Sequence, residues 1–272
     1  MTVIFLYIFT LGCCIGSFIN VLVNRLPRGE SIISPRSKCT TCGHKIRWYD
    51  NIPLISWVNL YGKCRNCKAP ISLFYPFVEL ITGFFFLLSI QSSPSIYQNI
   101  QFTSFFHKEF LGFIFVFLCL TLAILDAKYF WLPDIITLIG TFIGLISSLL
   151  LSITNKSLNF DLTINTFSGA IVGFLIFYSL SFIGKFLFNK PVLGGGDAKL
   201  AALLGAWLGI KGLLITIWFS FNTAGIFVII GLIFKKITLN QKIPFGVFLV
   251  TSGLLVWHFG NEKIFEFLKI PL

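Results

Sequence analysis

Long apolar runs separated by short polar segments dominate the sequence. The first extends from Val3 to Val23, and further runs cover roughly 77–96, 110–126, 135–153, 163–184, 200–217, 218–234 and 244–260. A helix needs roughly 20 apolar residues to cross a bilayer. The pattern therefore predicts an all-α polytopic membrane protein of about eight transmembrane helices. Lys211 and Gly212 interrupt the sixth and seventh runs, which leaves seven helices as the alternative.

A polar insert divides the apolar pattern into three parts. We expect a first transmembrane helix at 1–24, retained rather than removed as a signal peptide, an extramembrane insert at 25–76 and a membrane core at 77–272. Along the first helix Gly12, Gly16, Asn20 and Asn24 recur every four residues and share one face. This face is typical of close helix packing with amide hydrogen bonds; the alternative is that an Asn lines a polar site.

Composition and charge agree with a membrane protein. Hydrophobic residues make up 56% of the chain and charged residues only 11%, and the net charge is +11. Basic residues gathered in loops are what membrane orientation produces, so we do not expect nucleic acid as a partner. Sixteen of the 21 Lys and Arg fall on one side of the eight predicted helices. The positive-inside rule places that side in the cytoplasm, with both termini external and the insert internal.

The insert carries two cysteine pairs with metal-site spacing, Cys39-Thr-Thr-Cys42 and Cys64-Arg-Asn-Cys67. Two such pairs can close a tetrahedron of thiolates around structural Zn²⁺, with no position left for water. Gly43 suits the tight turn after the first pair. A redox dithiol or unliganded thiols are the alternatives. The other cysteines, Cys13, Cys14 and Cys119, are expected to be small buried apolar residues.

Two carboxylates stand out among only ten Asp and Glu. Asp126 ends the third predicted helix and Asp197 begins the sixth, so both lie at the cytoplasmic end. Carboxylates at membrane level are functional candidates. Two close carboxylates can share one proton, which lets one activate water while the other holds the proton. The alternatives are ion pairs with Lys128 or Lys199, or helix capping by Asp197.

Other residues near these carboxylates are weaker candidates. Gly194 and Gly196 flank a third glycine before Asp197, and glycines allow another backbone, such as a peptide substrate, to come close. Asp134 follows Pro133 and is expected to cap the next helix or to serve as a second carboxylate of the pair. Glu79 is expected to reach the interface and pair with an Arg, or to belong to a second polar site.

At these residues the sequence closely resembles the type IV prepilin peptidases, a family of bacterial membrane aspartic peptidases with a Gly-x-Gly-Asp motif. The similarity covers nearly the whole chain. It is carried by Gly16–Val21 with Arg25-Leu26-Pro27, both cysteine pairs, Asn51-Ile52-Pro53, Tyr75-Pro76 with Glu79, Asp126 with Leu132-Pro133-Asp134, Gly194–Lys199 and Ile243–Gly246. Two differences, Gly195 where Met is frequent and Val247 where Pro is frequent, remove no chemical group.

The resemblance implies a bifunctional enzyme of the inner membrane. It would cut the basic leader of type IV prepilins or type II secretion pseudopilins after a glycine, on the cytoplasmic side, with the core at 77–272 as peptidase. It would then methylate the new N-terminal amine with S-adenosylmethionine. Asp126 and Asp197 match the catalytic aspartates, Lys199 belongs to the same motif, and Glu79 is a candidate for the methyl-donor site. A proton-coupled transporter using the same carboxylates, and a scaffold carrying a zinc module, are the alternatives.

Overall fold

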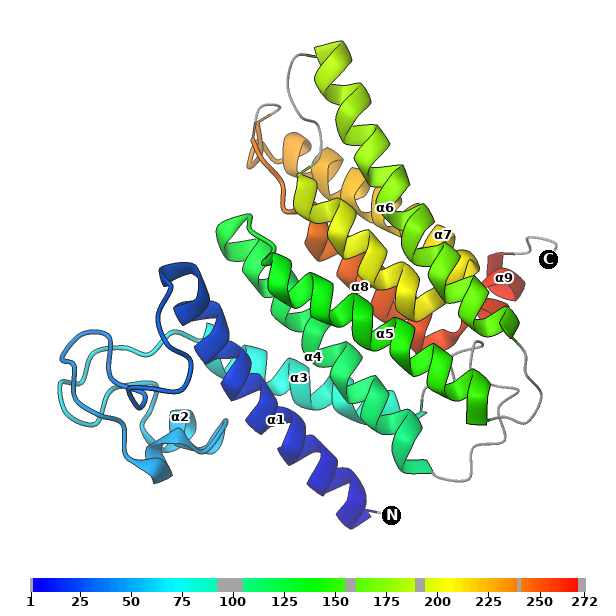
Figure 1. Ribbon diagram of the computed structural model, residues 1–272. Coiled ribbons are helices and arrows are strands. Elements are labelled where there is room, and N and C mark those ends of the chain that lie inside the picture. Colours follow the sequence, from blue (N-terminus) through cyan, green and yellow to red (C-terminus); the bar gives the residue numbers. More distant parts are fainter. Residues whose placement is uncertain (1, 92–104, 155–159, 189–193, 239–240, 269–272) are drawn as a thin grey trace. The chain divides into compact units, whose positions relative to one another are not determined.

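The computed structural model describes residues 2–91, 105–154, 160–188, 194–238 and 241–268, and its secondary structure is helical (Figure 1). The chain divides into two compact units. The first contains residues 1–90 and 112–121, and the second contains residues 91–111 and 122–272. In the described residues β-structure is limited to two isolated bridges within the insert, Lys38 with Lys45 and Lys63 with Pro70. The predicted all-α class is therefore confirmed.

The apolar runs form helices close to the predicted positions. Nine α-helices lie in the described residues: α1 Thr2–Arg25, α2 Ile55–Asn59, α3 Phe74–Gln91, α4 Phe105–Tyr129, α5 Asp134–Thr154, α6 Phe160–Phe188, α7 Gly195–Ile233, α8 Phe245–Phe259 and α9 Asn261–Leu268. Two short 3₁₀ turns, η1 Leu26–Arg28 and η2 Trp48–Asn51, also lie in the N-terminal segment.

In the first unit, α1 packs on α3 through its glycines. A Cβ at Gly12 would come within 2.7 Å of the Gly83 backbone, and a Cβ at Gly16 within 2.7 Å of the Glu79 backbone. Such contact requires glycine, because any larger side chain would separate the two helices. The predicted packing role of this face is confirmed.

Amide hydrogen bonds continue the same face of α1 toward the insert. Asn20 donates to the Tyr75 carbonyl at 3.1 Å, and Asn24 donates to the Tyr75 hydroxyl at 3.2 Å. The cysteines of α1 differ from one another. Cys13 is buried as expected, but Cys14 is exposed, because it lies on the outer face of α1, away from α3.

In the second unit, α6 and α7 approach each other closely. A Cβ at Gly205 of α7 would collide with the Gly169 carbonyl oxygen of α6, so the two backbones touch without side chains between them. On the α5 side, the fully buried Trp207 donates its indole N–H to the Gly140 carbonyl at 2.9 Å. The first half of α7 is thus held between α5 and α6.

The longest helix, α7, contains a break at Gly209. This residue has φ 68° and ψ −178°, a conformation that glycine adopts readily. The backbone N–H of Ile210, left without a helical partner, donates to the Asn165 side-chain oxygen at 3.0 Å. The chain reverses direction there, so that the second part of α7 runs antiparallel to the first (Figure 1). The predicted boundary between the sixth and seventh helices at 217 was therefore wrong by about two turns.

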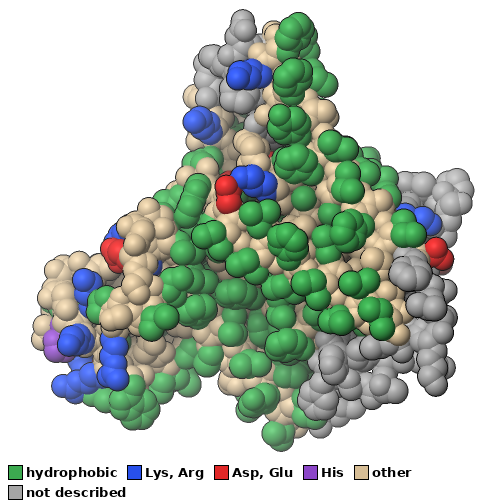
Figure 2. All heavy atoms as spheres, in the orientation of Figure 1, with side chains coloured by type: hydrophobic (Ala, Val, Ile, Leu, Met, Phe, Trp, Pro, Cys, Tyr) green, Lys and Arg blue, Asp and Glu red, His purple; other side chains and the backbone are tan. Residues whose placement is uncertain are grey.

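Five of the described helices are long and apolar enough to cross a membrane, namely α1, α4, α5, α6 and α7. The helices α3 and α8 are apolar but shorter. With α7 counted as two segments, the described residues contain the eight apolar helical segments expected. Hydrophobic side chains cover much of the helical surface in Figure 2. Apolar surface of this extent requires lipid rather than water around it.

Candidate active site and metal centre

Asp126 lies near the C-terminal end of α4, and its carboxylate reaches the first turn of α8. The side chain is buried, and its Oδ2 atom makes no hydrogen bond to the described residues. The backbone N–H groups of Gly246 and Val247 face this carboxylate, although they do not complete a hydrogen bond with Oδ2. The positive end of a helix is a favourable place for a carboxylate. A carboxylate oxygen left free is what a water-activating group needs.

Gly246 is glycine because Asp126 occupies the space where a side chain would be. A Cβ at position 246 would lie 2.8 Å from Asp126 Oδ2 and 3.3 Å from Leu200 Cδ2. In the sequence, Ile243–Gly246 only opens the last apolar run, at 244–260, and contributes to the family resemblance. Its glycine directly after Pro-Phe was the available signal, but the residue that it contacts is 120 positions away.

Asp197 is the third residue of α7 and stabilises the start of its own helix. Its Oδ2 atom accepts the Gly194 backbone N–H at 3.1 Å, in a capping-box arrangement. The side chain is buried. Asp197 therefore contributes to the capping of α7, although Gly194 rather than Asp197 is the N-cap residue, and this hydrogen bond uses only one of its two carboxylate oxygens.

The three glycines before Asp197 have different surroundings. A Cβ at Gly196 would lie 3.0 Å from Leu132 Cβ, so this position is packed against the segment that precedes α5. A Cβ at Gly195 would meet nothing within 4 Å, and Gly194 and Gly195 are exposed. The open side of the motif can therefore admit another peptide backbone.

The fold brings Asp126 and Asp197, 71 positions apart in the sequence, to the same group of helix ends. Both side chains are buried. Leu200, one turn after Asp197, lies against Gly246, which in turn lies against Asp126. The ends of three helices, α4, α7 and α8, therefore meet at this site.

Lys199 pairs with Asp134 rather than with Asp197. The Lys199 Nζ atom lies 2.6 Å from Asp134 Oδ1, and the Asp134 side chain is 64% exposed. The ion pair expected as an alternative for Asp197 is therefore absent from the described residues. Asp134 lies in the first turn of α5, where an acidic side chain is favoured. Its exposure and its basic partner distinguish it from the two buried aspartates.

Glu79 lies in the first unit, in α3, and is buried. Its Oε2 atom accepts the Leu54 backbone N–H at 2.8 Å, which ties the insert to α3. Among the described residues no Lys or Arg lies within ion-pair distance of Glu79, so the predicted pairing with a loop Arg was wrong. Glu79 lies one turn after Tyr75, whose carbonyl accepts from Asn20, and its burial agrees with the alternative of a second polar site.

The four cysteines of the insert converge as a metal site requires. The sulfur atoms of Cys39, Cys42, Cys64 and Cys67 lie within 4.8 Å of one another, and Cys39 Sγ is 3.9 Å from Cys67 Sγ. A tetrahedral Zn²⁺ with bonds of about 2.3 Å would place its sulfurs about 3.8 Å apart. The donor set therefore fits zinc, and the expected cluster is confirmed as a site that can hold a metal.

Each cysteine pair lies in a turn of the same construction. The N–H of Gly43 donates to the Cys39 carbonyl, and the N–H of Lys68 donates to the Cys64 carbonyl, both at 3.0 Å. Gly43 and Lys68 share the left-handed conformation, with φ of 69° and 60°. Gly43 therefore has the role predicted from the sequence. Hydrogen bonds from the backbone of Cys42 and Thr41 lower the pKa of the Cys39 thiol to about 6, which favours the thiolate that binds metal.

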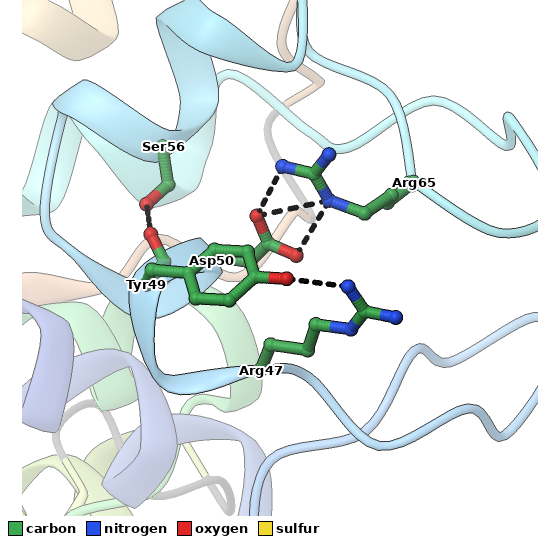
Figure 3. Close-up of polar contacts among 5 residues, drawn as sticks. All are labelled: Arg47, Tyr49, Asp50, Ser56 and Arg65. Atoms are coloured by element: carbon green, nitrogen blue, oxygen red, sulfur yellow. Dashed lines mark hydrogen bonds and ion pairs between the residues drawn. The ribbon is translucent and has the colours of Figure 1, made fainter.

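Polar contacts hold the rest of the insert around the second pair (Figure 3). Arg65 binds Asp50 with two nitrogens, at 2.7 and 2.9 Å, and holds the pKa of Asp50 below its usual range. Arg47 donates to the Tyr49 hydroxyl at 2.5 Å, and Ser56 donates to the Tyr49 carbonyl at 3.0 Å. These bonds connect η2, α2 and the turn of the second cysteine pair. A short polar segment buries too little apolar surface to be stable without such contacts.

Comparisons with known proteins agree with this site. Residues 10–92 match the model of the bacterial peptidase A24 N-terminal domain, and residues 113–230 match the model of the type IV leader peptidase family. A prepilin leader peptidase/N-methyltransferase of Aeromonas hydrophila is 33% identical over 95% of this chain and 91% of its own length. That of Pseudomonas aeruginosa is 31% identical over 93% and 89%.

A third relative of the same name, from Myxococcus xanthus, is 36% identical over 79% of this chain, which corresponds to 59% of the relative's own length. No solved structure matches the chain. The two family models together cover both the insert and the helices that carry the aspartates. The chain thus belongs to the type IV leader peptidase family, a family of membrane aspartic peptidases.

Proposed function

We propose that this chain cleaves the leader of type IV prepilins or type II secretion pseudopilins and then methylates the new N-terminus. The observation that carries the proposal is that two buried carboxylates, Asp126 and Asp197, lie at helix ends of α4 and α7 that both contact the start of α8. The names of the relatives, prepilin leader peptidase/N-methyltransferase, support the choice of substrate and of both reactions.

In the proposed cleavage the two aspartates share one proton. The ionised carboxylate takes a proton from a water molecule, and the resulting hydroxide adds to the scissile carbonyl carbon. The protonated carboxyl group donates its proton to the carbonyl oxygen, giving a neutral tetrahedral intermediate. When the carbonyl reforms, one hydroxyl proton of the intermediate returns to the carboxylate that had donated it. The C–N bond breaks, and the leaving nitrogen receives the proton first taken from water, so that the pair again holds one proton. The exposed Gly194 and Gly195 lie next to Asp197, where the glycine of the substrate can approach.

The substrate explains why this site should lie at the cytoplasmic face. The distribution of Lys and Arg supports a cytoplasmic position for the end of α4, the start of α7 and the insert. A basic leader that stays in the cytoplasm would meet the aspartates there. We therefore propose a multi-pass inner-membrane protein with both termini external.

Zinc would be held by the four insert cysteines and would act as a structural staple. Four thiolates leave it no position for water, so no step of the cleavage uses it. S-adenosylmethionine supplies the methyl group when bound. Its ammonium group needs an anionic partner, and Glu79 is a buried carboxylate with no cationic partner among the described residues, so Glu79 fits that role.

Replacing the aspartates tests the cleavage proposal. Asp126→Asn and Asp197→Asn should each lower the cleavage of a co-expressed prepilin by at least about 100-fold, because each removes an acid–base group. Asp134→Asn is the matched control, since Asp134 is exposed and paired with Lys199, and it should retain cleavage. Mass spectrometry of the product reports both the cleavage position and the added methyl group.

Immunoblots must show equal abundance of the three variants. Full cleavage by Asp126→Asn or Asp197→Asn would refute the two-carboxylate mechanism. For Glu79, binding of radiolabelled S-adenosylmethionine by Glu79→Gln protein should fall while prepilin cleavage is retained, and unchanged binding would remove Glu79 from the methyl-donor site.

A further inference from the structure

The short helix α2 of the insert has one inner and one outer face. Ser56 points inward, is buried, and donates to the Tyr49 carbonyl in η2 (Figure 3). Ile55 and Val58 are three residues apart, share the opposite face and are 58% and 64% exposed. Tyr61, which follows the helix, is also exposed. This face is thus apolar and without a partner among the described residues.

Two hydrogen bonds fix α2 beside the start of α3. The backbone N–H of Leu54, the residue before α2, donates to Glu79 of α3 at 2.8 Å. The indole N–H of Trp57 donates to the Ile71 carbonyl at 3.1 Å, just before α3 begins. Trp57 also packs on Gly62, whose position leaves no room for a side chain. The outer face of α2 is therefore held at the insert end of α3.

The exposed face of α3 is lined with apolar side chains. Phe77, Leu80 and Phe84 recur at helical spacing and are all exposed, which is typical of a face in contact with lipid. Leu73, directly before the helix, is exposed as well. Exposed apolar side chains thus lie both on α2 and along α3, and Leu54 and Trp57 tie the two helices together.

The insert also carries the charge that a phospholipid surface attracts. Residues 25–76 contain nine Lys and Arg but only two acidic residues, Glu30 and Asp50, which gives a net charge of +7. Asp50 is itself neutralised by Arg65. Exposed aromatic residues, Trp48 and Tyr61, accompany these charges, and Trp and Tyr are preferred at the headgroup level of a bilayer.

We propose that the outer face of α2, formed by Ile55, Val58 and Tyr61, is embedded in the headgroup layer of the bilayer that surrounds the helices. Its ligand is the anionic phospholipid of that leaflet. The apolar side chains enter the acyl boundary while the basic residues of the insert bind the headgroups. The cysteine cluster is thereby held against the membrane through Glu79 and Trp57.

The test measures how deeply Val58 lies in lipid. An environment-sensitive fluorescent amino acid replaces Val58 in the full-length protein, which is reconstituted in nanodiscs of phosphatidylcholine and phosphatidylglycerol. Doxyl-labelled lipid and aqueous iodide serve as the two quenchers. We expect loss of fluorescence with doxyl lipid, little with iodide, and weaker lipid quenching in pure phosphatidylcholine. The same label at Leu80 is the control, because that position faces lipid on α3.

Each other outcome contradicts the proposal. A Val58 label quenched by iodide and not by lipid lies in water. A label protected from both quenchers is covered by protein, either a second copy or a bound substrate. If the Val58 variant folds poorly, the label is placed at Tyr61 instead. The zinc content of each variant shows whether its insert is intact.

Discussion

Replacement of Gly246 by alanine should disturb Asp126 directly. The new Cβ would lie 2.8 Å from the Oδ2 atom of Asp126, whereas ordinary contacts are 3.4–4 Å long. The carboxylate or the first turn of α8 must therefore move by about 0.6 Å or more. Leu200, at 3.3 Å, limits movement on the other side. Overpacking of this kind costs roughly 1–3 kcal/mol of folding free energy.

The larger effect should fall on cleavage rather than on stability. A reacting group misplaced by about 1 Å can cost about 100-fold in rate, so a shift of more than half that size should cost about 10- to 100-fold. We expect this loss in kcat when the enzyme cleaves a purified prepilin. The reaction is monitored by separating precursor and product on a gel. KM should change little, because the exposed glycines before Asp197, where we propose that the substrate approaches, are untouched.

Gly253→Ala in the same helix is the matched control. Its Cβ would also lie 2.8 Å from a neighbouring atom, but that atom is the flexible Leu204 Cδ2, which can rotate away. This variant should show a similar or smaller loss of thermal stability and nearly normal cleavage. If Gly246→Ala and Gly253→Ala cleave equally well at equal stability, the contact between Gly246 and Asp126 has no part in catalysis.

Three further predictions concern metal, the break in α7 and pH. Cys39→Ser should abolish bound zinc in elemental analysis, whereas Cys14→Ser should retain one zinc per chain; equal zinc contents would contradict the site. Asn165→Leu leaves a backbone N–H unpaired and should lower the free energy of unfolding by about 1–3 kcal/mol in thermal denaturation, so an unchanged Tm would refute its role. Because Arg65 lowers the pKa of Asp50, their pair stabilises the insert above the ordinary Asp pKa of about 4 and is lost as the pH falls through the lowered value. The Tm difference between wild type and Asp50→Asn should thus be constant from pH 7 to 5 and shrink below pH 4; a difference that disappears at pH 5 would contradict this assignment.

Helix positions were predictable because apolar runs of sufficient length leave few alternatives in a bilayer. The packing face of α1 was also predictable, since glycine every four residues has a direct geometric meaning. The break in α7 was not. Lys211 and Gly212 interrupt the apolar run nearby, but the reversal itself depends on Asn165 of α6, which supplies the missing hydrogen-bond acceptor. A boundary set by a distant side chain cannot be placed from the local sequence alone.

In the candidate site, too, some features were predictable from the sequence and others were not. The cysteine spacing and the two aspartates carried their own signals, because these residue types are rare at membrane level. The partner of Lys199 could not be predicted in this way. Proximity in the sequence favoured an ion pair with Asp197, whereas the fold brings Asp134 to Lys199. Gly246 stood out only as part of the family pattern at the start of the last apolar run, although its lack of a side chain is what leaves room for Asp126.

The reversal at Gly209 determines at which end of the helices the next segment begins. As one straight rod, the 39 residues of α7 would extend for about 58 Å, and α8 would begin far from Asp197. The reversal returns the chain to the end at which α7 started, so that Gly246 can meet Asp126 there. A single residue with an unusual backbone angle thus determines on which side of the helical layer the last apolar helix begins.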